Sequence, residues 1–479
     1  MHVLILVHRW LGILFCLLFA MWFASGIVMH FVPFPALTEA ERIEGLALVE
    51  GSPGLRSPAE AAGAVKDAAR VRLLQRIDRP VYLVSGGNGT KALGADDLSD
   101  AAVRSENLAL AIAIDHARRR NLDVTQAALA ELTAMDQWTV SGAFNRHRPL
   151  YRIALNDAAG TDLYVSSSTG EVVGDTTRRE RGWNYAGSVA HWIYPTVLRS
   201  RAGTWNTTVW WLSLSALIAA LAGSLLGILK IKAAPGRGMS PYQGWHKWHH
   251  LLGLACMIFV VSWIFSGWLS MDSGRLFSTG APDSADTAKL VGAPAWKDWS
   301  NVEWRLSAAV KEIEWFPWDG KIYRRERTGL DAQRLVALGA GAPSAPHAFL
   351  GASEISASVG RIAAGCMAPT VIAADDSYAI PSSMPGAPVY RSVCGDVWYH
   401  VDGASGALLE RSDRSSRAYR WLYSALHTMD LPALKARPAL RSALIVTLCG
   451  FGFLFSLTGV VIGWRRLRLQ FSAHAANGG

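Results

Sequence analysis

The chain has 479 residues, 51% of them hydrophobic, and a formal net charge of +9 at pH 7. The hydrophobic excess lies in four apolar runs without Asp, Glu, Lys or Arg, which argues against a soluble protein. Much of the positive charge flanks these runs, so the net charge requires no nucleic-acid partner.

Each apolar run is long enough for the roughly 20 helical residues that cross a hydrocarbon core of about 30 Å. The runs are Leu11–Val32, Thr207–Leu229, Leu251–Met271 and Ser442–Trp464. We therefore predict an integral membrane protein with a bundle of four transmembrane helices. The first run resembles a signal peptide with Ala24-Ser25-Gly26 as its cleavage site. A copy of the same segment in mid-chain favours a retained helix instead.

The runs divide the chain into eight predicted segments. In chain order these are helix 1 (1–32), an extracytoplasmic domain (33–204), helix 2 (205–231), a cytoplasmic loop (232–247), helix 3 (248–271), a second extracytoplasmic domain (272–440), helix 4 (441–464) and a cytoplasmic tail (465–479). Basic residues without acidic neighbours predict this orientation, because such residues favour the cytoplasmic side. They lie between helices 2 and 3 and after helix 4: Lys230, Lys232, Arg237 and Lys247, then Arg465, Arg466 and Arg468.

Each large loop has the pattern of a mixed α+β domain. In the first loop we expect helices at Ala59–Val71 and Asn107–Arg119 and strands at Leu73–Ile77, Pro80–Val84, Leu150–Leu155 and Thr161–Val165. In the second loop we expect strands at Pro388–Val393 and Val397–Val401 and an irregular stretch at Leu338–Pro346. An amphipathic segment ends each loop, at Arg181–Tyr194 and Arg417–Met429, and we expect both at the outer membrane surface.

The five cysteines divide by location. Cys366 and Cys394 lie in the second large loop, which the predicted topology places in an oxidising compartment, so we predict a disulfide between them. Three others, Cys16, Cys256 and Cys449, lie within the helices as small apolar residues. The sequence has no C-x-x-C-H motif for covalent haem.

The chain matches itself at two nearly equal offsets. An offset of 241 aligns helix 1 with helix 3, and an offset of 236 aligns the end of the first loop and helix 2 with the end of the second loop and helix 4. Both copies begin on the same side, which predicts a parallel repeat with a pseudo-two-fold axis along the membrane normal. The matches include His8 with His249, Trp22 with Trp263, Ser25-Gly26 with Ser266-Gly267, His191 with His427, and Gly223 with Gly459.

Four of the thirteen histidines fall into matched pairs, His8 with His249 and His191 with His427. The predicted topology puts the first pair at the cytoplasmic side and the second near the external face. A pseudo-two-fold axis would bring the members of each pair face to face, as the two axial ligands of a planar haem iron require. Neutral imidazole also costs less to bury than a charge. A lone interfacial histidine is usually only amphipathic, so the pairing carries the prediction of two b-type haem sites.

Neighbouring residues refine this prediction. Glycines four residues after His8 and His249 (Gly12 and Gly253) would let a porphyrin lie against the backbone. His250 adjoins His249, and only the repeat offset favours His249 as the ligand. The remaining histidines have no repeat-matched partner, and we expect His147 in a solvated external loop.

The motifs that are missing also limit the function. The sequence contains no phosphate-binding loop and no strand-linked dinucleotide fingerprint. The cytoplasmic segments are too short for a flavin or nicotinamide domain. No charged residue interrupts the spans, which disfavours an ion-coupled transporter.

Several short motifs resemble those of the PepSY-associated transmembrane proteins. They are the H-x-x-x-G at the start of helices 1 and 3, the dipeptides Ser25-Gly26, Ser266-Gly267 and Thr458-Gly459, the pre-helix Leu426-His427, and the segment from Asp136 to Leu150. The resemblance covers the four helices and the ends of both loops. It implies two PepSY-like external domains and a bacterial inner-membrane location. The family includes ferric-siderophore reductases that bind b-type haem, and its histidines match His8, His191, His249 and His427.

Our leading hypothesis is a di-haem b-type electron-transfer protein that reduces a periplasmic ferric siderophore or another metal chelate. Its electron donor would be quinol or a cytoplasmic reductase, and the lipid bilayer its surroundings. One alternative is a non-redox binding or regulatory membrane protein whose PepSY-like domains hold a peptide or protease. Another is a carrier of iron or chelate.

Overall fold

The structure is a computed structural model that describes residues 1–49, 54–87, 89–232, 239–292, 296, 310–338 and 345–477. It divides into two compact units. We call them the helical unit, formed by Met1–Phe34, Gly182–Thr279 and Arg417–Gly479, and the sheet unit, formed by Pro35–Arg181 and Gly280–Ser416.

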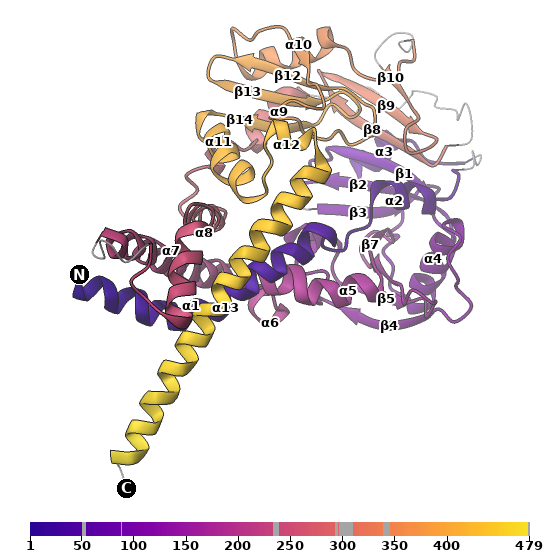
Figure 1. Cartoon of the computed structure of the whole chain (residues 1–479). Coiled ribbons are helices and arrows are strands. Elements are labelled where there is room, and N and C mark those ends of the chain that lie inside the picture. The colour runs from indigo at the N-terminus through magenta and orange to yellow at the C-terminus, as the bar shows by residue number, and fades with distance from the viewer. Residues whose placement is uncertain are drawn as a thin grey trace. The chain divides into compact units, whose positions relative to one another are not determined.

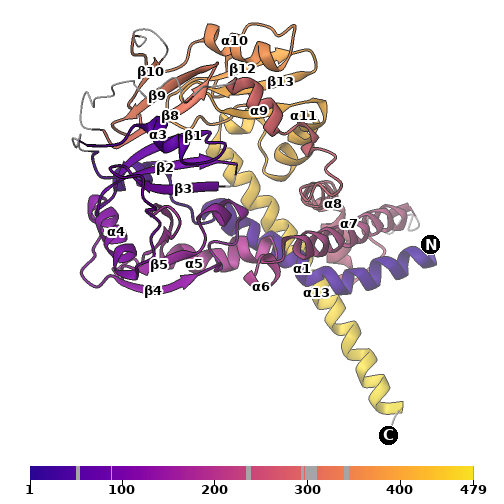
Figure 2. The same ribbon diagram turned by 180° about the vertical axis from the view of Figure 1, so that it is seen from behind.

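Four long helices form most of the helical unit: α1 (His2–Phe31), α7 (Ala202–Lys232), α8 (Gly244–Leu269) and α13 (Pro438–Asn477). Within the described residues, these four are long and apolar enough to cross a membrane, with mean hydropathies of 2.0 to 2.3. The four predicted spans are thereby confirmed. The helices extend beyond the apolar runs because their polar ends continue the same backbone hydrogen bonding. α13, yellow in Figures 1 and 2, is the longest at 40 residues.

The spans pack together through a small apolar core, and much of their remaining surface faces away from it. The core includes Phe15 and Phe23 of α1, Trp263 of α8 and Cys449 of α13, all buried. Only 28–33% of each span is buried inside the protein, so the remaining apolar surface is suited to lipid.

Short helices precede α7 and α13 in two similar series. The first runs from α5 (Arg178–Asn184) through the π-helix η2 (Tyr185–Val189) to α6 (Thr196–Arg199); the second runs from α11 (Arg414–Tyr419) through the π-helix η5 (Arg420–Ala425) to α12 (Pro432–Lys435). A short 3-10 helix, η3 (Ser278–Gly280), follows α8. π-Helical turns are rare and often accompany functional sites.

The sheet unit contains three antiparallel sheets. The first-loop strands are β1 (Arg70–Gln75), β2 (Pro80–Gly86), β3 (Gly89–Gly94), β4 (Ala128–Thr133), β5 (Leu150–Ala154), β6 (Asp162–Ser166) and β7 (Val172–Thr176). The second-loop strands are β8 (Glu312–Trp318), β9 (Lys321–Arg327), β10 (Gln333–Leu338), β11 (Thr370–Val371), β12 (Val389–Cys394), β13 (Val397–Asp402) and β14 (Leu408–Ser412). The helices are α2 (Glu39–Gly45), α3 (Pro58–Gly63), α4 (Glu106–Arg119), η1 (Gly142–His147), α9 (Ser284–Val291) and α10 (Ala352–Ile362).

The largest sheet joins the two loops. Its strand order is β10-β9-β8-β1-β2-β3, visible as one layer in Figure 1, with β1 of the first loop paired antiparallel to β8 of the second. β8 is buried at every residue because it lies between β1 and β9 with both faces covered. The two loops, predicted as separate domains, therefore share one sheet.

Most of the predicted loop elements agree with the structure. α4 and the hairpins β5–β6 and β12–β13 lie where the patterns place them. α4 buries Ala109, Ile112, Ala113 and Ala117 at helical spacing against a sheet. The helix predicted at Ala59–Val71 is wrong beyond Gly63: α3 ends there, and β1 begins at Arg70, drawn into the sheet by its partners. Residues 339–344 of the predicted irregular stretch lie outside the described residues.

The two loops also share an irregularity. The register of β6 against β7 shifts between Tyr164 and Val165, and that of β13 against β14 shifts between His400 and Val401. The two bulges are 236 residues apart, the same offset that aligns His191 with His427 in the sequence.

Candidate functional site

The four repeat-matched histidines lie in the helical unit. His8 is on α1 and His249 on α8, near the start of each helix. His191 and His427 each follow a π-helix closely, η2 and η5 respectively. All four side chains are partly buried.

The structure brings these residues together as two pairs. The ring centres of His8 and His249 are 6.2 Å apart, and those of His191 and His427 are 6.1 Å apart. Each pair joins residues about 240 positions apart, one from the first half of the chain and one from the second.

The Nδ1 atom of each paired histidine has a hydrogen-bonding partner. The partners are Ala219 O for His8 (3.2 Å), Thr458 Oγ1 for His249 (2.9 Å), Ser25 Oγ for His191 (3.0 Å) and Ser266 Oγ for His427 (3.1 Å). His427 Nδ1 also contacts the backbone oxygen of Trp263 at 3.2 Å. No Nε2 atom of these four residues forms a hydrogen bond to any residue that the structure describes. A carbonyl oxygen only accepts, so His8 carries its hydrogen on Nδ1 and leaves a lone pair on Nε2. An imidazole in that state can ligate a metal.

A glycine faces each of the four rings. A Cβ added at Gly223 would lie 2.4 Å from His8 Cε1, and one at Gly267 would lie 3.3 Å from His427 Cε1. The corresponding distances are 3.7 Å from Gly26 to His191 and 3.6 Å from Gly459 to His249. These glycines lie on α1, α7, α8 and α13, so every span contributes a side-chain-free surface beside a ring.

The glycines that follow His8 and His249 by four residues differ from each other. Nothing lies within 4 Å of a Cβ added at Gly12, whereas one at Gly253 would meet the Phe455 ring at 3.0 Å. Phe455 also stacks on His249, with ring centres 4.8 Å apart. The surface expected at Gly12 is therefore open, and the equivalent surface at Gly253 is covered by an aromatic ring.

The neighbouring His250 has a different environment. Its Nδ1 bonds Ser240 Oγ and its Nε2 bonds Gly227 O, each at 2.9 Å. Both ring nitrogens are thus occupied, which favours His249 over His250 as a ligand. His30 bonds Ser442 Oγ through Nε2 at 2.8 Å.

Sequence patterns did not identify two tryptophans that hydrogen-bond the segments following η2 and η5. Trp22 Nε1 donates to the backbone oxygen of His191 at 2.9 Å, and Trp263 Nε1 donates to that of Leu426 at 2.7 Å. Their match at the 241 offset was the available signal. It did not reveal that indole N–H groups would bond the backbone at or beside a paired histidine.

The remaining cysteine and histidine predictions fall in both units. Cys366 and Cys394 form a disulfide in the sheet unit, and Cys16, Cys256 and Cys449 are free and buried in the helical unit. His147 is buried instead of solvated, because Ser166 and the strands around it enclose the end of η1.

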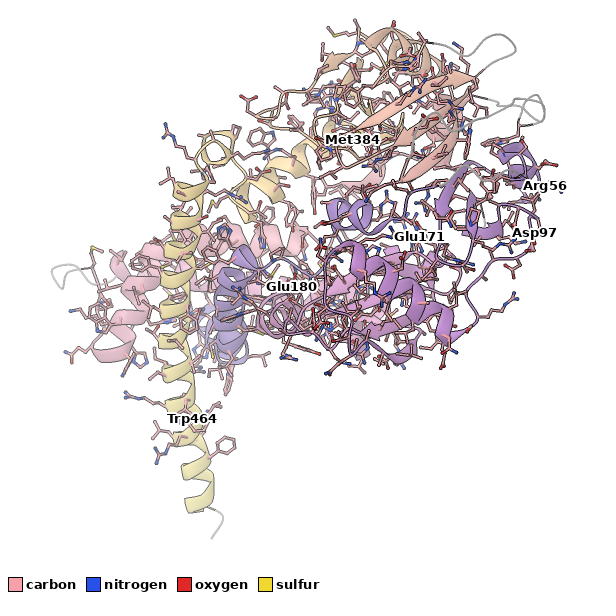
Figure 3. All side chains as sticks on the ribbon, turned by 90° about the vertical axis from the view of Figure 1, so that its right-hand side faces the viewer. Arg56, Asp97, Glu171, Glu180, Met384 and Trp464 are labelled. Atoms are coloured by element: carbon pink, nitrogen blue, oxygen red, sulfur yellow. A yellow bond between two sulfur atoms is a disulfide. The ribbon has the colours of Figure 1, made fainter. Side chains whose placement is uncertain are left out.

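Buried charge marks the centre of the sheet unit. Glu171, labelled in Figure 3, pairs with Arg72 at 2.5 Å and lines a cavity of ≈ 50 Å³ together with Arg42, Arg76 and His116. Burial would raise the pKa of Glu171, but Arg72 and Arg42 lower it below its ordinary value. Burial and the charges of Arg120 and Arg42 lower the pKa of His116 to about 3, so this imidazole is neutral.

Comparison with known proteins gives one family. The model of a family described as "PepSY-associated TM region" matches residues 5–357, which is more than half of the chain and includes His8, His191 and His249. No curated protein matches the sequence.

Proposed function

The chain belongs to the PepSY-associated transmembrane family, and we propose that it is a di-haem b-type electron-transfer protein that reduces an external ferric chelate. The two histidine pairs at opposite ends of the span bundle carry this proposal. His8 and Ser25, the hydrogen-bonding partner of His191, are 17 positions apart on α1, or about 26 Å at the helical rise. That distance approaches the hydrocarbon thickness of about 30 Å.

The residues of each pair fit a haem. Imidazole nitrogens bind metals at about 2 Å and lie roughly 1 Å from their ring centre, so two imidazoles that held one iron between them would have centres on the order of 6 Å apart. The observed 6.2 and 6.1 Å agree with this spacing. Each proposed haem site would therefore use two imidazoles, His8 with His249 and His191 with His427. Bound haem would supply a one-electron ferric/ferrous couple at each pair.

The protein's own residues hold and shield these sites. The Nδ1 hydrogen bonds fix the ring orientations, and the facing glycines keep space beside the rings. The buried core between the pairs consists of apolar and aromatic side chains such as Phe23, Phe259 and Trp263. Such a core excludes water, which favours electron transfer over side reactions.

The same proposal includes the orientation and the repeat. We place both termini in the cytoplasm, the sheet unit in the periplasm and the spans in the bacterial inner membrane. Exposed Lys247 in the first turn of α8 and exposed Arg465 and Arg466 on α13 support this orientation, as does exposed Trp464, which Figure 3 labels on α13. The matching bulges, histidine pairs and glycine contacts support two copies of one unit.

The donor and acceptor follow from the orientation. Quinol or a cytoplasmic reductase would supply electrons to the His8–His249 side. A ferric siderophore or another metal chelate would accept one electron per Fe(III) at the His191–His427 side and leave as Fe(II). The bilayer surrounds the spans.

An absorbance spectrum of the purified full-length protein tests the proposal. We expect haem bands that shift with dithionite, two haems per chain, and reoxidation of the reduced protein by ferric hydroxamate. His250→Ala is the matched control and should keep both haems. A colourless protein from haem-replete cells would refute the proposal and leave the binding or regulatory alternative. If the protein contains haem but ferric chelates do not oxidise it, the proposal that a ferric chelate is the electron acceptor is wrong.

A further inference from the structure

The dipeptide of Ser or Thr followed by Gly occurs three times near a paired histidine: Ser25-Gly26, Ser266-Gly267 and Thr458-Gly459. The glycine of each faces an imidazole. The hydroxyl of each contacts the Nδ1 atom of the same imidazole at 2.9 to 3.1 Å. All three hydroxyl residues are buried, with exposures of 0 to 5%.

The direction of these hydrogen bonds follows from the other contact of each hydroxyl. Ser25 Oγ donates to Met21 O at 2.6 Å, Ser266 Oγ donates to Trp263 O at 3.0 Å, and Thr458 Oγ1 donates to Phe455 O at 2.6 Å. A hydroxyl has one hydrogen, and here it is directed at a backbone carbonyl. The oxygen must therefore accept from the imidazole, which places the imidazole hydrogen on Nδ1.

We propose that Ser25, Ser266 and Thr458 are positioning residues that hold His191, His427 and His249 as Nδ1–H tautomers with Nε2 directed to a haem iron. This inference rests on the proposed function and assigns a role to a motif that the function alone leaves unexplained. A histidine ligand typically donates its second N–H to a nearby acceptor, which fixes the tautomer and raises the basicity of the ligand.

The fourth paired histidine, His8, has a different Nδ1 acceptor, and this difference supports the role. The residue equivalent to Thr458 at the 236 offset is Ala222, which has no hydroxyl, although Gly223 follows it. His8 instead donates through Nδ1 to the backbone oxygen of Ala219 at 3.2 Å. All four histidines thus have an acceptor at Nδ1. In the external pair each Nδ1 contacts a hydroxyl, and His427 Nδ1 also contacts the Trp263 backbone oxygen. In the cytoplasmic pair the acceptors are one hydroxyl and one carbonyl.

The acceptors should also set the reduction potentials. An acceptor at Nδ1 increases electron donation by the imidazole and so stabilises the ferric state. Loss of the hydroxyl should therefore raise the midpoint potential of the affected haem. Ser25→Ala should raise the potential of one haem, and Thr458→Ala should raise that of the other. Ser266→Ala should raise the potential less than Ser25→Ala, because the Trp263 backbone oxygen remains an acceptor for His427 Nδ1.

The experiment compares the full-length holoprotein with these variants by spectroelectrochemical titration and low-temperature electron paramagnetic resonance. Ser213→Ala and Ser456→Ala are matched controls, because both serines are buried in spans and donate to a carbonyl four residues earlier, and neither hydroxyl hydrogen-bonds a paired histidine. Ser25→Thr, Ser266→Thr and Thr458→Ser keep the hydroxyl and should retain the original potentials. Haem loss in an Ala variant that the hydroxyl-retaining variant restores also supports the role.

Two outcomes would overturn it. If the three Ala variants have the same potentials and resonance spectra as Ser213→Ala, the positioning role is wrong and the di-haem function stands. A parent protein that contains no haem removes the proposed function itself and the positioning role with it.

Discussion

Arg72 of β1 and Glu312 of β8 form an ion pair of 3.0 Å across the junction between the two large loops. Glu312 is almost fully buried and also pairs with Arg42 at 2.9 Å. Burial would raise the pKa of Glu312, but Arg42 and Arg72 hold it well below its usual range. These contacts join residues from both halves of the chain, so they stabilise the sheet that the loops share.

Glu312→Gln should destabilise the sheet unit by about 1.5–3 kcal/mol, the range for hydrogen bonds to charged groups. The substitution removes one carboxylate partner from Arg42 and one from Arg72, which keep Glu39 and Glu171 as partners. Thermal unfolding of the detergent-solubilised protein, followed by near-ultraviolet circular dichroism, measures the change. Glu60→Gln is the control, because the Glu60–Arg56 pair is exposed and should contribute little. Equal melting temperatures for both variants would contradict this account.

The same carboxylate predicts a pH dependence. Because the pKa of Glu312 is depressed in the folded state, its contribution is complete above the unfolded value of about 4.3 and is lost as the pH falls through the folded value. The melting temperature of the sheet unit should therefore fall in acid, and fall less in Glu312→Gln. A parallel decline in both proteins would show that other groups dominate.

Substitution of the paired histidines should remove haems by pair. His191→Ala or His427→Ala should lose one haem, and His8→Ala or His249→Ala should lose the other, because each iron would lose an axial ligand. Haem stoichiometry by pyridine haemochrome and the residual potential identify which site is lost. Loss of the same haem in His8→Ala and His191→Ala would show that the pairing is wrong.

The facing glycines should tolerate alanine to different degrees. Gly223→Ala should displace His8 and reduce haem content most, since the new Cβ would lie 2.4 Å from the ring. Gly267→Ala, at 3.3 Å, should have a smaller effect, and Gly459→Ala, at 3.6 Å, little. Gly450→Ala on α13 is the control, because nothing lies within 4 Å of its added Cβ. The ratio of haem absorbance to protein measures the series, and an order unrelated to these distances would argue against close packing on the rings.

The disulfide should stabilise the sheet unit. Cys366 and Cys394 close a loop of 28 residues, so Cys394→Ser together with Cys366→Ser should cost about 3–4 kcal/mol by the chain-entropy relation. Peptide mass analysis without reductant tests the bond, and the melting temperature tests its effect. Free alkylation of both thiols in protein from the oxidising compartment would contradict it.

The sequence by itself determined the four spans and the pairing of the histidines. A span requires only a sufficient length of apolar residues, and a window moved along the sequence detects such a run directly. The offsets of 241 and 236 predicted which histidines correspond, and the structure brings His8 near His249 and His191 near His427.

Only the tertiary structure decided which hydrogen-bonding partners these residues have. The sequence separates His249 from His250 only by the repeat offset, whereas the structure shows that both ring nitrogens of His250 bond Ser240 and Gly227. The sequence also shows strands in both loops, but not that β1 pairs with β8 about 240 residues away. Ala59–Val71 has helical character, yet its end becomes strand because β2 and β8 offer backbone partners. Hydrogen bonds between distant segments depend on which groups the folded chain brings within about 3 Å, and local pattern does not encode that distance.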